Sequence, residues 1–134
     1  MENLMFKYFL IVIGSTQVIV ALVEAIAPVR AFWMWKTWVS GRFFQVHGLM
    51  LIFTGLPLTI YKGYLSPVIF YIGLLVVFMG PFILIYPEKI QKVFDDSENI
   101  FNQKDIKIMI YFDAFFRFIC GVIFLVSCWK TFLN

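Results

Sequence analysis

A membrane-length apolar stretch that ends in a proline and a basic residue occurs twice in this chain, at residues 11–30 and 70–89. Four matching pairs lie 59 positions apart: Gly14 and Gly73, Ala21 and Gly80, Pro28 and Pro87, and Arg30 and Lys89. Two further pairs, Gly48 with Ala114 and Gly55 with Gly121, lie 66 positions apart, which indicates a seven-residue insertion. The pattern predicts an internal duplication, with repeats at residues 8–61 and 67–132 inside one membrane domain, residues 1–134.

Four apolar runs approach or exceed the roughly 20 residues that a transmembrane helix needs. They are residues 8–27, 43–61, 67–86 and 108–132. Hydrophobic residues make up 62 % of the chain, whereas soluble domains are nearer to half apolar. We therefore expect an all-α membrane protein with four transmembrane helices, arranged as two repeated hairpins. Because each repeat has an even number of spans, both copies should share one orientation, with a symmetry axis along the membrane normal.

Each predicted hairpin has a long connection with interfacial character. Residues 29–42 alternate tryptophan with arginine and lysine, a composition that favours the headgroup layer. In the other connection, Pro87 precedes Ile90, Val93 and Phe94 at helical spacing, which predicts a short amphipathic helix. Residues 95–99, which are rich in acidic side chains, are expected to form a solvated turn.

The basic residues predict the orientation in the membrane. Seven lie in the two long connections and three on the opposite side, and positive charge favours the cytoplasmic face. The seven are Arg30, Lys36, Arg42, Lys89, Lys92, Lys104 and Lys107, and the three are Lys7, Lys62 and Lys130. We expect cytoplasmic long connections and both termini outside. Basic residues grouped at the ends of apolar runs do not form a nucleic-acid-binding stripe.

Small residues recur every seven positions in all four predicted spans. Because lipid supplies no hydrophobic force between helices, close backbone contact at small residues has to hold them together. A seven-residue period predicts left-handed crossings of about 20°. The predicted packing residues are Gly14, Ala21, Gly48, Gly55, Gly73, Gly80, Ala114 and Gly121.

Polar residues fall on the same helix faces as the small ones. Gln17, Glu24 and Arg117 each lie three positions after a small residue, and Asp113 precedes Arg117 by four. Charges inside a bilayer are costly and normally paired, so we expect Glu24 to meet Arg117, with Asp113 as a second partner. The alternative is that Glu24 extends about 6 Å to the headgroups. If the pair forms, a structural clasp is favoured over a transport site.

The single histidine, His47, lies close to the predicted interface and is expected to be an interfacial or hydrogen-bonded side chain. A bis-histidine haem would need a second histidine from another chain. With one histidine and no Cys-x-x-Cys motif, neither a metal site nor a cofactor is expected.

The arrangement of small residues and prolines is similar to that of the YjeT-like family of very short bacterial inner-membrane proteins. In that family, one hairpin carries a Gly-rich span, a Pro-Arg turn and a second Gly-rich span. The matching residues here are Gly14, Pro28, Arg30, Gly48 and Gly55, then Gly73, Pro87, Lys89 and Gly121. The resemblance implies a duplicated small bacterial inner-membrane protein and no particular activity; the aromatic first connection and the insertion depart from it.

The sequence shows no nucleophile–base pair, metal cluster, phosphate loop or large aqueous domain, so we do not expect an enzyme. The leading interpretation is an accessory or scaffolding subunit of a membrane protein complex, in contact with lipid and with other integral membrane subunits. The alternative is a small transporter or channel, formed as a homo-oligomer, with Gln17, Glu24, Asp113 and Arg117 along a path. A third interpretation, based on His47 and the tryptophans, is a haem- or quinone-associated subunit of an electron-transfer complex.

Overall fold

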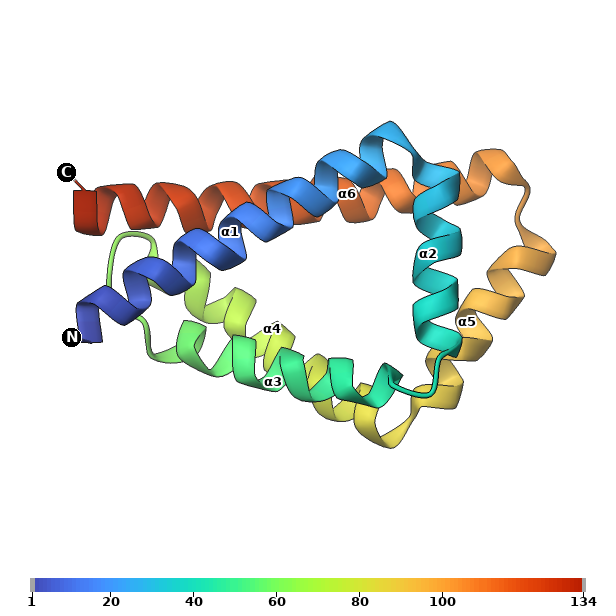
Figure 1. The fold of residues 1–134 in the computed structure, drawn as a ribbon, viewed down its shortest axis with the longest axis horizontal. Coiled ribbons are helices and arrows are strands. Elements are labelled where there is room, and N and C mark those ends of the chain that lie inside the picture. Colours follow the sequence, from blue (N-terminus) through green and yellow to red (C-terminus); the bar gives the residue numbers. More distant parts are fainter. Residues whose placement is uncertain (1, 134) are drawn as a thin grey trace.

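The structure, a computed structural model, describes residues 2–133, which are almost entirely helical (Figure 1). The helices are α1 (Glu2–Ile26), α2 (Pro28–Ser40), α3 (Phe44–Ile60), α4 (Ser66–Ile85), α5 (Pro87–Ile100) and α6 (Gln103–Cys128), followed by a π-helical turn at Trp129–Leu133. Three of them, α1, α4 and α6, are long and apolar enough to cross a membrane, and α3 joined to α2 across a 100° bend gives a fourth candidate. The expectation of an all-α membrane protein is confirmed at this level.

The helix boundaries follow from local sequence. Pro28 and Pro87 occupy the first turns of α2 and α5, where the missing backbone N–H costs nothing. Asn102 caps α6, because its side-chain oxygen accepts a hydrogen bond from the Asp105 backbone N–H at 3.0 Å. Leu65 takes a left-handed φ of 61° in the tight connection that reverses the chain between α3 and α4.

The long helices form two tightly packed pairs, α1 with α6 and α3 with α4 (Figure 1). The pairs approach each other at the end that carries both termini, and α2 and α5 lie across the opposite end. The result is a triangular frame. Its apolar cores lie at its corners: one contains Leu10, Leu58 and Phe124 near the termini, and two smaller ones hold α2 against its neighbours.

This pairing differs from the repeated hairpins expected from the sequence. The two spans of each expected repeat, α1 with α3 and α4 with α6, are held apart at one end by the intervening helix, α2 or α5. Each span has its main partner in the other repeat. For α1 and α6 this is the neighbourhood that the expected contact of Glu24 with Arg117 requires. The periodicity of small residues defines which face of a helix is packed, but it carries no information on which helix packs there.

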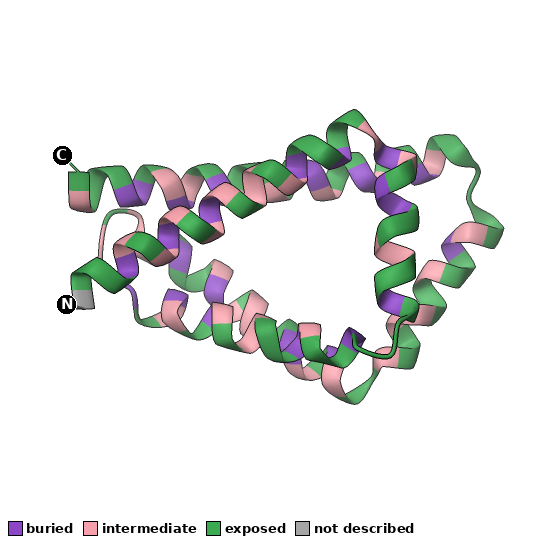
Figure 2. Ribbon diagram, viewed as in Figure 1, coloured by how far each residue is buried: buried purple, intermediate pink, exposed green. Residues whose placement is uncertain are grey.

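All eight predicted small residues are buried, and the glycines lie at backbone crossings. A Cβ atom placed on Gly14 would lie 3.1 Å from the Gly121 carbonyl oxygen, and one on Gly55 would lie 2.9 Å from that of Gly73. Gly48 and Gly80 face each other in the same way, and Ala21 and Ala114 are buried. The small rows therefore lie between helices, and many bulky apolar residues are exposed. Buried and exposed residues alternate along each long helix, as expected for helices that are packed on one face (Figure 2).

The expected acidic turn at residues 95–99 is wrong, because α5 continues through it to Ile100. Ser97 is buried and its hydroxyl donates to the Val93 carbonyl at 2.7 Å, one turn back along the helix. On the same helix, Asp95 and Glu98 pair with Lys36 of α2. The cation between the two helices thus offsets the acidic charges that suggested a turn. The amphipathic helix expected from Pro87 onward is confirmed, and it is longer than expected.

Candidate functional site

A cluster of polar side chains lies between α1 and α6, toward the end of the frame where α2 crosses. Its centre is the Arg117 guanidinium. The Nε–H of Arg117 donates to Asp113 Oδ2 at 2.7 Å, and Nη1 donates to Gln17 Oε1 at 2.9 Å. Arg117 Nε also lies 3.1 Å from Glu24 Oε1. The structure therefore brings together Gln17, Glu24 and Arg117, which the sequence placed on inward helix faces, and Asp113, the predicted second partner of Arg117.

Glu24 is the least satisfied member of the cluster. Its side chain is 1 % exposed, and within residues 3–133 neither carboxylate oxygen accepts a hydrogen bond. The reason is geometric: Arg117 Nε carries a single hydrogen, and that hydrogen is directed at Asp113. The contact between Glu24 and Arg117 is therefore a charge contact without a hydrogen bond. The sequence left two possibilities for Glu24: a contact with Arg117, or an extended side chain that reaches the headgroups. In the structure Glu24 is buried and contacts Arg117.

The formal charges of the cluster do not balance. Two carboxylates, Glu24 and Asp113, share one guanidinium, Arg117. Ionised groups buried in a membrane are costly unless they are paired and hydrogen-bonded. The cluster therefore contains one carboxyl group more than it has cations, and the Glu24 carboxyl group is the one without a hydrogen-bond donor.

Helix α2 covers the cluster. Its Trp35 ring lies 4.9 Å from Arg117 Cζ, in cation–π contact. Ala31 and Phe32, on the same helix, pack against Ile106 and Ile110 of α6. The alternation of tryptophan with basic residues predicted a position at the membrane interface and did not indicate that Trp35 contacts Arg117. The spacing of Ala31, Trp35 and Trp38, at i, i+4 and i+7, was the signal of a shared helix face.

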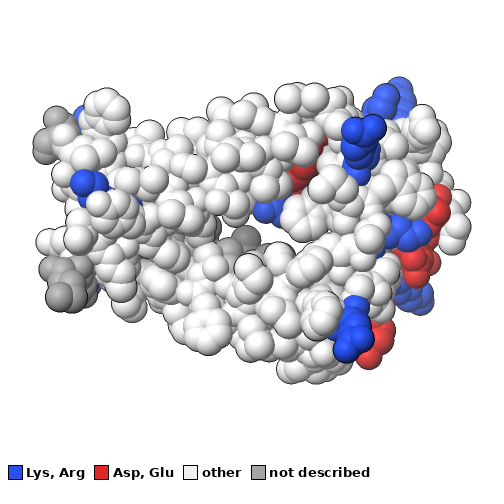
Figure 3. Space-filling model, in the orientation of Figure 1, with Lys and Arg blue, Asp and Glu red and all other residues white. Residues whose placement is uncertain are grey.

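His47 lies apart from the charged cluster, on α3. Its ring is surrounded by the aromatic rings of Trp35, Trp38 and Phe44, with centroid distances of 6.5, 6.1 and 6.2 Å. It lines a cavity of about 330 Å³ that Asp113 and Arg117 also line from α6. In the space-filling view a hollow opens between the two helix pairs, with charged atoms at its edge (Figure 3). Three of the predicted polar residues, His47, Asp113 and Arg117, thus border one interior space from two sides.

A second cavity of about 330 Å³ lies between α1 and α2, on the other side of Glu24. Its walls are apolar apart from that one carboxylate. They are formed by Ile19, Val20, Val23, Ala31, Met34, Trp35 and Trp38. Glu24 is therefore buried between the ion cluster and an apolar pocket.

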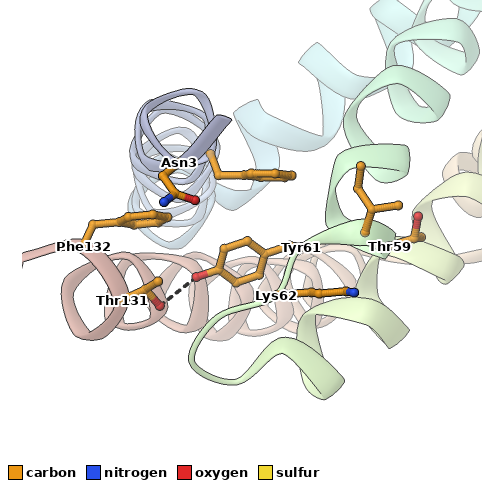
Figure 4. A pocket seen from close by; sticks show the side chains of 8 residues that line it. Asn3, Thr59, Tyr61, Lys62, Thr131 and Phe132 are labelled. Atoms are coloured by element: carbon orange, nitrogen blue, oxygen red, sulfur yellow. Dashed lines mark hydrogen bonds between the residues drawn. The ribbon is translucent and has the colours of Figure 1, made fainter. Parts of the chain in front are cut away.

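A further pocket of about 730 Å³ lies at the opposite end, near the termini (Figure 4). There the Tyr61 hydroxyl forms hydrogen bonds with Thr131 at 2.9 Å and with buried Ser127 at 2.8 Å. These bonds tie the end of α3 to the end of α6. The sequence analysis missed this network because hydroxyl side chains near helix ends carry no distinctive spacing.

Within the described part of the chain, no group of three or more His, Cys, Asp or Glu side chains is arranged to hold a metal ion. The chemistry that the arrangement between α1 and α6 does offer is a buried ion contact, in which Arg117 lies between the carboxyl groups of Glu24 and Asp113.

Comparison with known proteins returned no match to any family model, curated protein or solved structure. The resemblance to the YjeT-like family therefore stays a prediction from the sequence, and the functional argument depends on the geometry of this chain alone.

Proposed function

We propose that this chain is a small integral membrane transporter or channel for a cationic solute, with Glu24 as its central binding group. The observation that carries the proposal is the fully buried Glu24 carboxylate, which has no hydrogen-bond donor and shares its one cation with Asp113. A purely structural clasp would be expected to satisfy its buried members. A binding site, in contrast, keeps a group unsatisfied until its ligand arrives. The sequence favoured an accessory subunit over a transporter. Because Glu24 has no hydrogen-bond donor, we place the transporter first.

The polar residues extend only part of the way through the frame. From Arg117 they reach Gln17 on α1, and beyond it the apolar core around Leu10, Leu58 and Phe124 closes the space between the helix pairs. A solute that crosses the membrane along this route requires the two pairs to separate at the end near the termini. The route to Glu24 is shorter from the end covered by α2.

Flux measurements on purified protein in liposomes test the proposal. We expect cation flux that is lost in Glu24→Gln, because the amide keeps the shape of the side chain and removes its charge. Glu88→Gln is the matched control, since Glu88 is an exposed carboxylate in the first turn of α5. Equal flux in wild type and Glu24→Gln, across protons, alkali cations and alkylammonium ions, would contradict the proposal.

A second candidate, an accessory subunit of a larger membrane complex, is favoured by one surface feature. Phe112, Phe115, Phe116 and Ile119 form an exposed stripe along α6 at helical spacing. Aromatic stripes of this kind suit contact with a partner membrane helix. A photoreactive phenylalanine analogue at position 115 should then give a discrete protein adduct in native membranes. The same analogue at exposed Phe78 of α4 is the control, and lipid adducts alone at both sites would exclude this candidate.

We also infer that the two halves arose by duplication, in a bacterial cytoplasmic membrane with both termini outside. The contacts of Gly14 with Gly121 and of Gly73 with Gly55 support this, because the two contacts are equivalent in the repeat: Gly14 corresponds to Gly73, and Gly121 corresponds to Gly55. The charge distribution supports the orientation: charged side chains gather at the end formed by α2 and α5 (Figure 3). Labelling of single cysteines at positions 7 and 92 with an impermeant reagent in intact cells should modify position 7 only; labelling of position 92 alone would invert the orientation.

A further inference from the structure

The cavity that His47 and Arg117 border is enclosed by every helix except α1. Its volume is about 330 Å³, and its lining is apolar or aromatic apart from His47, Asp113 and Arg117. Glu24 is not among the residues that line it. Met79 of α4 lines the cavity and is also exposed, so the cavity opens at the surface of the helix frame. A ligand dissolved in the bilayer can therefore reach it.

Two opposite walls of this cavity carry polar groups with unused hydrogen-bonding capacity. A guanidinium has five N–H donors. Arg117 gives Nε–H to Asp113 and one Nη1–H to Gln17, and Nη2 donates to no described residue. Its side chain is 27 % exposed and lines the cavity. On the α3 wall, the His47 ring contacts aromatic rings, and neither of its nitrogens is hydrogen-bonded within the described part of the chain.

The charges around the cavity restrict what it can hold. A cation would meet the Arg117 guanidinium, and the nearby Asp113 is already paired with that group. An anion would compete with two carboxyl groups, Glu24 and Asp113, for the same guanidinium. A hydrocarbon chain would fill the space and leave the donors of both walls without acceptors. The cavity therefore suits a neutral ligand that has acceptor oxygens on opposite sides.

The remaining walls suit a flat ring. Phe32 and Phe44 supply aromatic surface, and Met79 and Met109 supply thioether groups. Aromatic rings pack favourably against both kinds of side chain. A neutral, planar molecule with acceptor oxygens at both ends of its ring combines these requirements with solubility in lipid.

We propose that this cavity binds the head group of a membrane quinone, with one carbonyl oxygen accepting a hydrogen bond from Arg117 and the other from His47. Both carbonyl oxygens are acceptors, which matches the donors on the two walls. The opening at Met79 leads a lipid-soluble tail out of the frame. The inference goes beyond the proposed function and does not depend on it, because Glu24 does not line this cavity. It gives a location to the quinone of the third interpretation of the sequence.

The tryptophans provide a readout of occupancy. Trp35 and Trp38 line the cavity, whereas Trp33 and Trp129 do not. Protein labelled with ¹⁵N-tryptophan in lipid nanodiscs would be titrated with menadione, a quinone without a tail, and the indole N–H signals followed by NMR. We expect saturable shifts of the Trp35 and Trp38 signals, with Trp129 unchanged. At equal concentration in the lipid, 2-methylnaphthalene should bind about tenfold more weakly, because it has the same carbon skeleton and lacks both acceptor oxygens.

Two variants separate hydrogen bonding from shape. His47→Phe keeps a ring and removes its nitrogens, so it should weaken menadione binding roughly two- to tenfold, the contribution of one hydrogen bond. The same variant should leave 2-methylnaphthalene binding unchanged. Met79→Trp places a larger side chain at the opening and should weaken the binding of both compounds. Met50→Trp, at an exposed position of α3 outside the cavity, should bind both as the wild type does.

The inference is overturned if the shifts do not saturate, if 2-methylnaphthalene binds as tightly as menadione, or if His47→Phe binds menadione as the wild type does. The outcomes are distinct from those of the flux experiment. Saturable, His47-dependent menadione binding without cation flux would support the quinone site and refute transport. Cation flux that depends on Glu24, without saturable menadione shifts, would refute the quinone site alone.

Discussion

The close crossing of α3 and α4 at Gly48 and Gly80 predicts that even one methyl group at position 80 disturbs the fold. A Cβ on Gly80 would lie 2.6 Å from the Gly48 carbonyl oxygen and 2.5 Å from Ile52 Cγ1, whereas ordinary contact begins at 3.4 Å. The Ile52 side chain can rotate away. The carbonyl belongs to the backbone of α3, so the two helices have to move apart to restore a normal distance.

The expected cost of Gly80→Ala is the balance of two effects. Overpacking a well-packed site costs about 1–3 kcal/mol, and replacing a helical glycine by alanine returns about 0.5–1 kcal/mol. The difference between the two ranges is about 0–2.5 kcal/mol, and because the clash is with a backbone oxygen we expect a net destabilisation of about 1 kcal/mol or more. Gly41→Ala is the matched control, because Gly41 follows α2 with φ of −74° and its Cβ would come no closer than 3.2 Å to other atoms. That variant should stay within about 0.5 kcal/mol of wild type.

Equilibrium unfolding in mixed micelles of rising SDS fraction, followed by circular dichroism, measures both variants against wild type. A lower midpoint for Gly80→Ala, with Gly41→Ala unchanged, would support backbone contact between α3 and α4. If Gly80→Ala were instead stabilised by the helix-propensity gain, the close crossing would be refuted, because that result requires free space at the new methyl group.

Three further predictions concern the helix ends. Tyr61→Phe removes the hydroxyl that is hydrogen-bonded to buried Ser127, and it should lower the free energy of unfolding by about 1–3 kcal/mol in the same titration; no change would show that the bond is not formed. Asn102→Ala deletes the cap of α6 and should cost about 1 kcal/mol, whereas Asn102→Asp, which can also cap, should not. Lys36→Met breaks the partly exposed contact with Glu98 and should cost less than about 1 kcal/mol; a larger loss would mean that α2 depends on this ion pair.

The sequence was informative about the faces of the helices. Small and polar residues share a period, so the inward position of Gln17, Glu24 and Arg117 could be derived from spacing alone. The proximity of Glu24 and Arg117 could be predicted because a buried charge in a bilayer needs a counter-charge, and the predicted spans contain few basic residues away from their ends.

Apart from the contact of Glu24 with Arg117, the sequence did not show which helices pack together, nor did it give distances. Spacing does not distinguish a contact of Gly14 with Gly55 of its own repeat from one with Gly121 of the other repeat, because both glycines present the same small surface. In the structure Gly14 contacts Gly121. Nor can spacing show how the hydrogens of Arg117 are shared between Asp113 and Glu24, which depends on geometry of a few tenths of an ångström. The unsatisfied carboxylate that carries the functional proposal is therefore visible only in three dimensions.

The central claim is that Glu24 is a binding group and not a structural clasp, and the stability of Glu24→Gln tests it most directly. Removing one partner of a buried structural ion pair costs about 3–5 kcal/mol. In Glu24→Gln, Asp113 still pairs with Arg117. We therefore expect the free energy of unfolding of this variant in the SDS titration to equal or exceed that of wild type. Arg117→Met leaves two carboxyl groups without their cation and should be strongly destabilised. A loss of several kcal/mol in Glu24→Gln would contradict the account and establish the clasp.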